Sequence, residues 1–333
     1  MAANQPNPPM PDAQGARPEV LTAAKLWPPM MEALHGAFMV HDRVHQSDPA
    51  AFAAVAPRIR AIAASGESKV PRELIAQMPA LEIISVFGVG YDGVDVAAAL
   101  ERGIAVTHTP NVLNDEVADL AMALALAVSR RIVEADRYVR AGRWASGPMP
   151  LARKVSGARM GIVGLGRIGL AIARRAEAFG MSIAYTARSE KPGSGYRFLP
   201  SAERLAAEVD FLVVITPGGA GTRKLIDAKV LAALGREGYL INVARGSVVD
   251  EQALVEALKN GAIAGAGLDV FEDEPNVPAE LFALDNVVLT PHVGSATWQT
   301  RHAMGDLAFA NLAAHFAGKP LLSPVPEMGR KAA

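Results

Sequence analysis

Residues 161–169 read Gly-Ile-Val-Gly-Leu-Gly-Arg-Ile-Gly and lie near the middle of the 333-residue chain. Three of these glycines have the Gly-x-Gly-x-x-Gly spacing of a dinucleotide-binding turn. The apolar stretch Met160–Val163 precedes the turn, the helical stretch Arg167–Phe179 follows it, and Met181–Thr186 reads as the next strand. In this context the glycines make the tight turn, let the backbone approach a pyrophosphate and allow the helix to pack on the strand. The segment therefore predicts the first βαβ unit of a cofactor domain.

Apolar segments of strand length alternate with helical stretches along the chain, which is the pattern of parallel α/β sheets. The expected strands before the glycine turn are Val20–Leu26, Ala37–Val40, Ile59–Ala63, Ile83–Phe87 and Ile104–Thr107. Those after its own βαβ unit are Phe211–Ile215, Tyr239–Val243, Gly265–Val270 and Val287–Leu289. A single long helix is expected from Asn114 to about Ala141, followed by a loop at 142–150. The fold class is therefore α/β, with two doubly wound parallel sheets.

The chain order of these segments predicts two domains, one of them discontinuous. A complete nucleotide-binding unit fills residues 114–295, and a second α/β domain occupies 20–113. Residues 296–333 contain one expected helix and no strand, too little to fold alone, so we expect them to return to the N-terminal domain and to leave a cleft between the domains. Residues 1–19 are rich in proline, lack an apolar signal-peptide core and are expected to be a disordered tail.

Composition excludes several classes of function. The chain has 33 basic and 34 acidic residues and a net charge of −1, so no overall field attracts nucleic acid or an anionic membrane. It has no cysteine, which excludes disulfides, a thiol nucleophile and thiolate metal sites, and no cluster of metal ligands stands out. The apolar run Val117–Val128 is too short to span a bilayer. We therefore expect a cytoplasmic protein that uses no metal.

The residues after the second strand of the cofactor unit indicate which dinucleotide is bound. They read Ala-Arg188-Ser189-Glu190-Lys191, where an NAD-binding unit would have an acidic residue for the ribose 2′-hydroxyl. Arg188 can bind a 2′-phosphate and Ser189 can donate to it, which favours NADPH over NADH. Two alternatives remain. In the first, the turn shifts by one residue and Glu190 reaches the ribose. In the second, Arg188 and Lys191 are merely a solvated surface.

Three charged or titratable residues follow successive expected strands in the second half of the chain. They are Arg245, Glu274 and His292. Ligands bind at the carboxyl ends of strands in open α/β sheets, so this placement suits catalysis. Reduction of a 2-keto acid needs an imidazolium that donates a proton to the carbonyl oxygen, a carboxylate that orients the ring, and a guanidinium that binds the substrate carboxylate. The alternative for each residue taken singly is an ordinary surface charge.

Six ordered segments resemble the D-isomer-specific 2-hydroxyacid dehydrogenase family, over nearly the whole chain after residue 20. Besides the glycine turn they are Gly88-Val-Gly-Tyr-Asp-Gly-Val-Asp95, Thr109-Pro-Asn-Val-Leu-Asn-Asp-Glu-Val-Ala-Asp119, Asn242-Val-Ala-Arg-Gly246, Leu268-Asp-Val-Phe-Glu-Asp-Glu-Pro275 and Thr290-Pro-His-Val-Gly-Ser-Ala-Thr297. The resemblance implies a Rossmann cofactor domain inserted in a flavodoxin-like substrate domain. It also implies that Arg245, Glu274 and His292 are the catalytic residues.

The resemblance extends to the residues expected to hold the ligands. Val89 and Gly90 would bind the substrate carboxylate through backbone N–H groups, together with Arg245 and His292. The implied cofactor-binding residues are Gly164, Leu165, Gly166, Arg167, Ile168, Arg188, Ser189, Thr216, Pro217, Val243, Ala244, Asp269 and Gly294. A homodimer is implied as well, and Trp144 is expected either to reach the partner subunit's site or to be an interface or core tryptophan.

The loop 217–222 and the pair Arg188-Ser189 resemble the NADPH-linked glyoxylate/hydroxypyruvate reductase branch of the family. We therefore expect NADPH-dependent reduction of glyoxylate to glycolate and of hydroxypyruvate to D-glycerate. A reductase of bulkier 2-keto acids, such as hydroxyphenylpyruvate or 2-ketogluconate, is the alternative of the same class. A dinucleotide-sensing corepressor is the alternative of another class.

Overall fold

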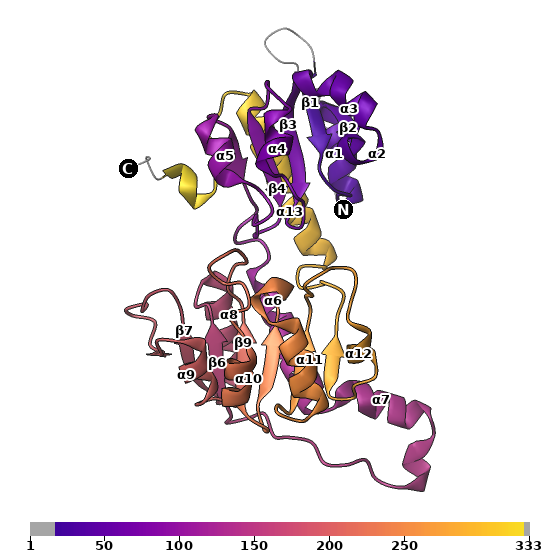
Figure 1. Ribbon diagram of the computed structural model, residues 1–333, viewed down its shortest axis with the longest axis vertical. Coiled ribbons are helices and arrows are strands. Elements are labelled where there is room, and N and C mark those ends of the chain that lie inside the picture. The colour runs from indigo at the N-terminus through magenta and orange to yellow at the C-terminus, as the bar shows by residue number, and fades with distance from the viewer. Residues whose placement is uncertain (1–16, 330–333) are drawn as a thin grey trace. The chain divides into compact units, whose positions relative to one another are not determined.

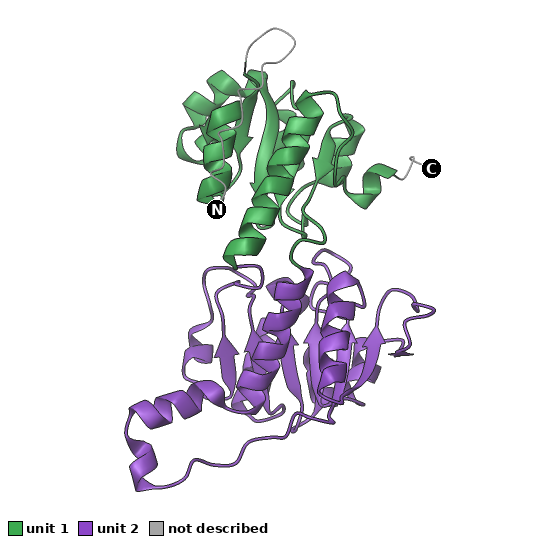
Figure 2. Cartoon of the chain, turned by 180° about the vertical axis from the view of Figure 1, so that it is seen from behind, with its two compact units in different colours: residues 1–113, 297–333 green, residues 114–296 purple. Residues whose placement is uncertain are grey.

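The computed structural model describes residues 17–329, which form two compact units (Figure 2). Unit 1 contains the chain up to Leu113 and from Thr297 onward, and unit 2 is the continuous segment Asn114–Ala296. The tail expected over residues 1–19 lies outside the described residues except at its end. There the expectation is wrong, because Glu19 begins the first strand, β1 (Glu19–Thr22).

Unit 1 is built on a five-stranded parallel sheet. Its other strands are β2 (Met39–Asp42), β3 (Ile59–Ser65), β4 (Ile83–Phe87) and β5 (Ala105–Thr107). The strand order is β2-β1-β3-β4-β5, which is the flavodoxin-like order. The inner strands β3 and β4 are mostly apolar and buried because helices cover both faces of a parallel sheet, whereas the edge strand β2 has no buried residue.

The helices of unit 1 cover the sheet on two sides. One face carries α3 (Pro49–Val55), α4 (Arg72–Ala76) and α5 (Val96–Glu101), and the other carries α1 (Pro28–Ala37) and α13 (Trp298–Phe316). The short elements α2 (Val44–Ser47), η1 (Ala56–Arg58) and η4 (Pro326–Gly329) complete the unit. The C-terminal helix α13 packs on β4, where the buried Ser85 hydroxyl donates to the Ala308 carbonyl over 2.9 Å.

Unit 2 has a seven-stranded parallel sheet. Its strands are β6 (Arg159–Val163), β7 (Ser182–Thr186), β8 (Arg197–Phe198), β9 (Phe211–Val214), β10 (Tyr239–Asn242), β11 (Gly265–Leu268) and β12 (Val287–Leu289). The order β8-β7-β6-β9-β10-β11-β12 is that of a dinucleotide-binding fold with one added edge strand, β12. The strand order reverses between β6 and β9, where such folds bind their ligands. The α/β fold class predicted from the sequence is therefore confirmed.

Helices cover both faces of the unit 2 sheet. Figure 1 shows α9 (Ala202–Ala206), α10 (Ala228–Leu234) and α11 (Glu251–Lys259) in front of it, and α6 (Asn114–Ser129) and α8 (Arg167–Ala178) pack together on the other face. Two glycines of β11 allow α6 to lie close, since a Cβ atom at Gly267 would come within 2.9 Å of Leu124 Cβ. The short elements η3 (Gly246–Val248) and α12 (Ala279–Phe282) lie in the loops. No helix within residues 17–329 is both long and apolar enough to cross a membrane.

The single long helix expected from Asn114 to about Ala141 is wrong. The chain leaves the helix after Ser129, and Arg131 has the left-handed φ of 53°, which a right-handed helix cannot contain. The Arg131 guanidinium then bonds both carboxylate oxygens of Glu134, at 2.6 and 2.8 Å, and starts α7 (Ile132–Arg140). Helix α7 has no buried residue and, with η2 (Arg143–Ser146), extends away from the body of unit 2 (Figure 1).

Candidate active site

Arg245, Glu274 and His292 all lie in unit 2, in the loops that follow β10, β11 and β12. These three strands are parallel neighbours, so their carboxyl ends meet at one edge of the sheet. The structure thus places the three residues in adjacent loops, although they are up to 47 positions apart in the sequence (292 − 245).

A short hydrogen bond joins His292 to Glu274. The Nδ1 atom of His292 lies 2.7 Å from Oε2 of Glu274, and both side chains are partly exposed, at 29% and 23%. The carboxylate can only accept, so Nδ1 carries the hydrogen of this bond. The other carboxylate oxygen, Oε1, accepts from the Phe271 N–H over 2.9 Å.

The surroundings of Glu274 keep its carboxylate ionised. Burial alone would raise the pKa of Glu274, but the hydrogen bond and positive charge of His292, the Phe271 N–H and the charge of Arg245 together hold this pKa below its usual value. An ionised Glu274 favours the protonated form of the imidazole beside it. The pair is therefore arranged to hold and release a proton.

The turn that carries Arg245 is shaped by Asn242, the last residue of β10. The Asn242 side chain is buried, accepts from the Ala244 N–H and donates to the Arg245 carbonyl, each over 3.1 Å. The Arg245 guanidinium donates to the Ala244 carbonyl over 2.7 Å. The sequence patterns identify Arg245 but assign no role to Asn242. The sequence signal for Asn242 is its position at the end of a strand, three residues before Arg245.

Gly246 lets the arginine loop approach the glutamate loop. A Cβ atom at this position would lie 1.8 Å from the backbone carbonyl carbon of Phe271, far inside van der Waals contact. Only glycine fits there without displacing the Phe271–Glu272 backbone. The Arg245 and Glu274 loops can therefore lie this close only because residue 246 is glycine.

Asp269 clamps the loop on which His292 sits. Its carboxylate is 2% exposed and accepts from Thr290 Oγ1 at 2.6 Å, from the Val293 N–H at 2.8 Å and from the Gly294 N–H at 2.9 Å. Its backbone carbonyl accepts from the His292 N–H over 2.9 Å. His292 itself has a left-handed φ of 51°, a conformation that such a clamp helps to hold. Burial raises the pKa of Asp269 in spite of these hydrogen bonds.

The glycine turn at the end of β6 has the shape that a pyrophosphate needs. Gly164 has a φ of 106°, and a Cβ there would lie 2.9 Å from the Thr216 nitrogen, while a Cβ at Gly169 would lie 2.3 Å from the Gly164 carbonyl oxygen. A Cβ at Gly166 would meet no atom within 4 Å. Gly166 is the N-cap of α8 and makes no side-chain cap, so no capping side chain occupies the first N–H groups of that helix. These residues fit a dinucleotide.

The other residues expected at the cofactor lie at the same edge of the sheet. Leu165 is buried, Arg167 is exposed and Ile168 is half-buried in the first turn of α8. Four more residues follow the neighbouring strands β9 and β10. They are Thr216, Pro217, Val243 and Ala244. Val243 and Ala244 are both buried.

Arg188 and Ser189 lie just past the end of β7, the strand next to the glycine-turn strand β6. Both are exposed, and so is Glu190. The Arg188 guanidinium makes no hydrogen bond or ion pair with any residue between 17 and 329, which leaves it available to an anion. The Tyr185 hydroxyl, bonded to the Lys191 N–H over 2.6 Å, fixes the start of the following turn.

Val89 and Gly90 belong to unit 1 and follow its strand β4. Both are half-buried. Across the described part of the chain, their N–H groups have no hydrogen-bond partner, and unpaired neighbouring N–H groups of this kind are what an anion needs. A Cβ at the preceding Gly88 would come within 3.0 Å of Gly66 Cα, so this loop also depends on a glycine.

Comparison with known proteins decides the family. The model of the D-isomer specific 2-hydroxyacid dehydrogenase NAD-binding domain matches residues 122–294, which include the glycine turn and all three charged residues. The chain belongs to the D-isomer-specific 2-hydroxyacid dehydrogenase family. Members transfer hydride between a nicotinamide dinucleotide and the CH–OH group of a 2-hydroxy acid, so this dehydrogenase is an oxidoreductase of that class.

Three relatives illustrate how similar this dehydrogenase is to named enzymes. Glyoxylate/hydroxypyruvate reductase A of Arabidopsis thaliana is 52% identical, over 80% of this chain and 85% of the relative. Hydroxyphenylpyruvate reductase of Plectranthus scutellarioides is 54% identical, over 81% and 86%. The solved NADPH-dependent glyoxylate/hydroxypyruvate reductase of Sinorhizobium meliloti, in complex with NADP and malonate, is 49% identical, with a TM-score of 0.89 over 96% of this chain and 100% of that one.

The position of Trp144 in the dehydrogenase excludes a core role for this tryptophan. Trp144 lies on η2 at the end of the α7 extension and is 70% exposed. It is therefore not a core tryptophan of its own unit. It shares this extension with other exposed apolar residues, among them Ile132 and Val139.

Proposed function

We propose that this dehydrogenase is an NADPH-dependent reductase of glyoxylate and hydroxypyruvate, with glycolate and D-glycerate as products. The observation that carries the proposal is the 2.7 Å contact between His292 and Glu274, which lie in the loops after β12 and β11, beside the loop of Arg245. This set supplies the proton and the charge that reduction of a 2-keto acid requires. The high identity to named glyoxylate and hydroxypyruvate reductases supports the choice of substrate.

Each side chain has a definite task in the reaction. A bound nicotinamide supplies the hydride that adds to the carbonyl carbon. His292 donates the proton of Nε2 to the carbonyl oxygen, while Glu274 holds the ring by Nδ1 and stabilises its positive charge. Arg245 binds the substrate carboxylate and polarises the carbonyl group. The N–H groups of Val89 and Gly90 bind the same carboxylate.

The test of this proposal is a steady-state panel of 2-keto acids with both cofactors. Glyoxylate and hydroxypyruvate with NADPH should give the highest kcat/KM. Preference for hydroxyphenylpyruvate or 2-ketogluconate would favour the bulkier-substrate alternative, to which the relative from Plectranthus scutellarioides lends support. Cofactor binding without turnover of any acid would favour a dinucleotide sensor.

The choice of NADPH rests on Arg188, which is exposed and without a partner in the described chain, where an NAD-binding unit has a carboxylate. Replacing Arg188 by alanine should raise the KM for NADPH by about tenfold or more, because a charge-assisted contact to the 2′-phosphate is lost. The KM for NADH should change little. The exposed Arg204 on α9 provides the matched control, Arg204→Ala. Equal effects of Arg188→Ala on both cofactors would contradict the assignment.

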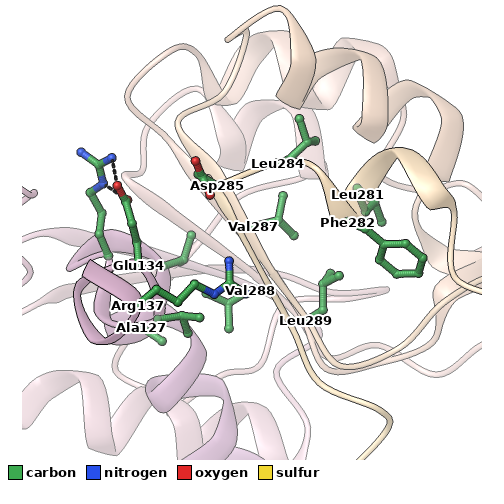
Figure 3. Close-up of a pocket in the computed structure, with 13 residues that line it drawn as sticks. Ala127, Glu134, Arg137, Leu281, Phe282, Leu284, Asp285, Val287, Val288 and Leu289 are labelled. Carbon is green, nitrogen blue, oxygen red and sulfur yellow. Dashed lines mark hydrogen bonds and ion pairs between the residues drawn. The ribbon is translucent and has the colours of Figure 1, made fainter. Parts of the chain in front are cut away.

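A homodimer is the assembly that the surface of unit 2 favours. The α7 extension exposes Ile132, Val139, Trp144 and the 98% exposed Leu151. Beside it, the edge strand β12, α7 and α12 enclose a pocket with the side chains of Val288, Leu289 and Phe282 around it (Figure 3). The exposed apolar side chains of the extension, beside an edge that also carries Glu134, Arg137 and Asp285, fit a second copy of the chain.

The oligomeric state can be measured by analytical ultracentrifugation. The native chain should sediment as a dimer, and Val139→Asp should shift it toward the monomer. If Trp144 reaches the partner's site, Trp144→Ala should raise the KM for the keto acid while the dimer persists. A native monomer would overturn this part of the proposal.

A further inference from the structure

A buried histidine in unit 1 holds the peptide that joins Val89 to Gly90. His108 follows β5 and is 8% exposed, and its Nδ1 atom lies 2.9 Å from the Val89 carbonyl oxygen. A carbonyl oxygen can only accept, so Nδ1 must carry the hydrogen and donate it. The bond therefore assigns the proton to Nδ1, whichever state Nε2 is in.

Because the Val89–Gly90 peptide is planar, the hydrogen bond to the Val89 carbonyl also sets the direction of the Gly90 N–H group. The only cis peptide bond within the described residues is Glu274–Pro275, so the Val89–Gly90 peptide is trans. In a planar trans peptide the C=O and N–H bonds point in opposite directions. While His108 holds the Val89 carbonyl on one side, the Gly90 N–H must point to the other side.

His108 is itself held firmly by the chain that follows α13. Its N–H donates to the Ser323 carbonyl over 3.1 Å, and the Ser323 hydroxyl donates to its carbonyl over 2.6 Å. Asn311 on α13 donates to the Ser323 hydroxyl over 2.8 Å, which ties this contact to the helix. The Tyr91 ring packs edge-on against the His108 ring, with centroids 5.2 Å apart. The donor is thus fixed by its own backbone and by a neighbouring ring.

We propose that His108 is a positioning residue, which by donating from Nδ1 to the Val89 carbonyl keeps the Gly90 N–H directed at the substrate carboxylate. The inference rests on the proposed function, in which Val89 and Gly90 bind that carboxylate. A fixed N–H group needs no reorientation when the anion arrives, and so strengthens binding. His108 does not touch the reacting atoms, so it acts on substrate binding and not on proton transfer.

The test compares a variant that cannot donate with one that can. His108→Leu removes the donor, whereas His108→Asn carries an amide N–H at the same number of bonds from the backbone as Nδ1. With saturating NADPH, His108→Leu should raise the KM for glyoxylate about tenfold and leave kcat within about twofold, because only the anion contact is weakened. His108→Asn should bring KM back to within about threefold of the native value.

Two further measurements separate this role from general packing. Tyr91→Phe loses the 3.0 Å bond from the Tyr91 hydroxyl to Glu327 but keeps the ring against His108, so its KM should stay near the native value. The Kd for oxalate, a carboxylate that is not turned over, should weaken with His108→Leu in parallel with KM. The Kd for NADPH should not change in any of these variants.

The outcomes are distinguishable. An unchanged KM and oxalate Kd in a folded His108→Leu variant would overturn the inference, and so would a His108→Asn variant as impaired as His108→Leu. His108→Ala takes the place of the leucine variant if that protein does not fold. A native enzyme that reduces no 2-keto acid would instead overturn the proposed function. The Kd for oxalate in His108→Leu would then still test whether His108 supports anion binding.

Discussion

The two units present different groups at the carboxyl edges of two similar parallel sheets. In unit 2 the loops after β10, β11 and β12 carry the charged side chains Arg245, Glu274 and His292. In unit 1 the loop after β4 offers the backbone N–H groups of Val89 and Gly90. Proton transfer needs particular side chains, whereas an N–H group needs only the right backbone conformation. Under the proposed function, loss of the proton-transferring pair Glu274 and His292 in unit 2 should therefore lower kcat, whereas changes in the Val89–Gly90 loop of unit 1 should raise the KM for glyoxylate.

The largest effect is expected for His292→Ala. Without the imidazole no group donates the proton, so kcat for glyoxylate reduction should fall by roughly two orders of magnitude or more. Steady-state assays at saturating NADPH measure the change in kcat. The midpoint of thermal unfolding shows whether the variant is folded. His35→Ala, at an exposed histidine of α1, is the matched control. A near-normal kcat for His292→Ala would contradict the assignment of proton transfer to unit 2.

Gly246→Ala should have the next largest effect. The new Cβ would lie 1.8 Å from the Phe271 carbonyl carbon, so the Arg245 and Glu274 loops must move apart. We expect kcat to fall about tenfold or more and the free energy of unfolding to drop by about 1–3 kcal/mol. Both are measured on the purified variant, by steady-state kinetics and by denaturant unfolding.

The matched control for this substitution is Gly36→Ala in α1, where a Cβ meets no atom within 4 Å. It should leave both quantities unchanged or slightly raise stability. If Gly246→Ala behaved like Gly36→Ala, the close approach of the two loops would have no part in catalysis.

Glu274→Gln should move the pH profile of reduction. The pKa of Glu274 is held below its usual value, so the native carboxylate is ionised across the neutral range and favours the protonated imidazole. Without that charge the imidazole loses its proton at lower pH, and the basic limb of kcat against pH should shift down by about one pH unit. A profile measured from pH 5 to 9 gives the shift. The neighbouring Glu272, paired with Arg223, supplies the control Glu272→Gln, whose profile should coincide with the native one.

The smallest effect is expected in unit 1, for Gly88→Ala. The added Cβ would lie 3.0 Å from Gly66 Cα, so the Val89–Gly90 loop should shift by a few tenths of an ångström. The KM for glyoxylate should rise about threefold to tenfold, with kcat within about twofold. Initial rates over a range of glyoxylate concentrations measure both constants. A lower kcat at unchanged KM would contradict the assignment of substrate binding to the unit 1 loop.

Much of the fold can be predicted from the sequence because its strands are short apolar runs that end in turns. Both parallel sheets follow from that alternation. The expected helix over 114–141 is wrong for a specific reason. Apolar residues continue through Ile132 and Val133, so the pattern does not show the left-handed Arg131 that separates two helices. Strand β8 has two residues and leaves no pattern to detect.

The candidate site can be predicted only in part. A charged residue directly after an apolar strand is visible in the sequence, and this is how Arg245, Glu274 and His292 are found. Asn242 and His108 are not visible in the same way. Their partners are backbone atoms, and for His108 the partner is the Val89 carbonyl, which tertiary packing brings near. Polar residues that support a backbone conformation therefore have to be found in the structure.

The insertion of unit 2 into unit 1 has a consequence for synthesis on the ribosome. The bond from Ser85 to Ala308 joins residues 223 positions apart, and it lies in the packing of α13 on β4. At about 5–20 residues per second, roughly 10–45 s pass between the appearance of its two ends. During that interval unit 2 is completed as one continuous segment, while the apolar face of β4 has not yet met its helix. We therefore expect a chaperone to bind the nascent segment up to Leu113 until α13 is made.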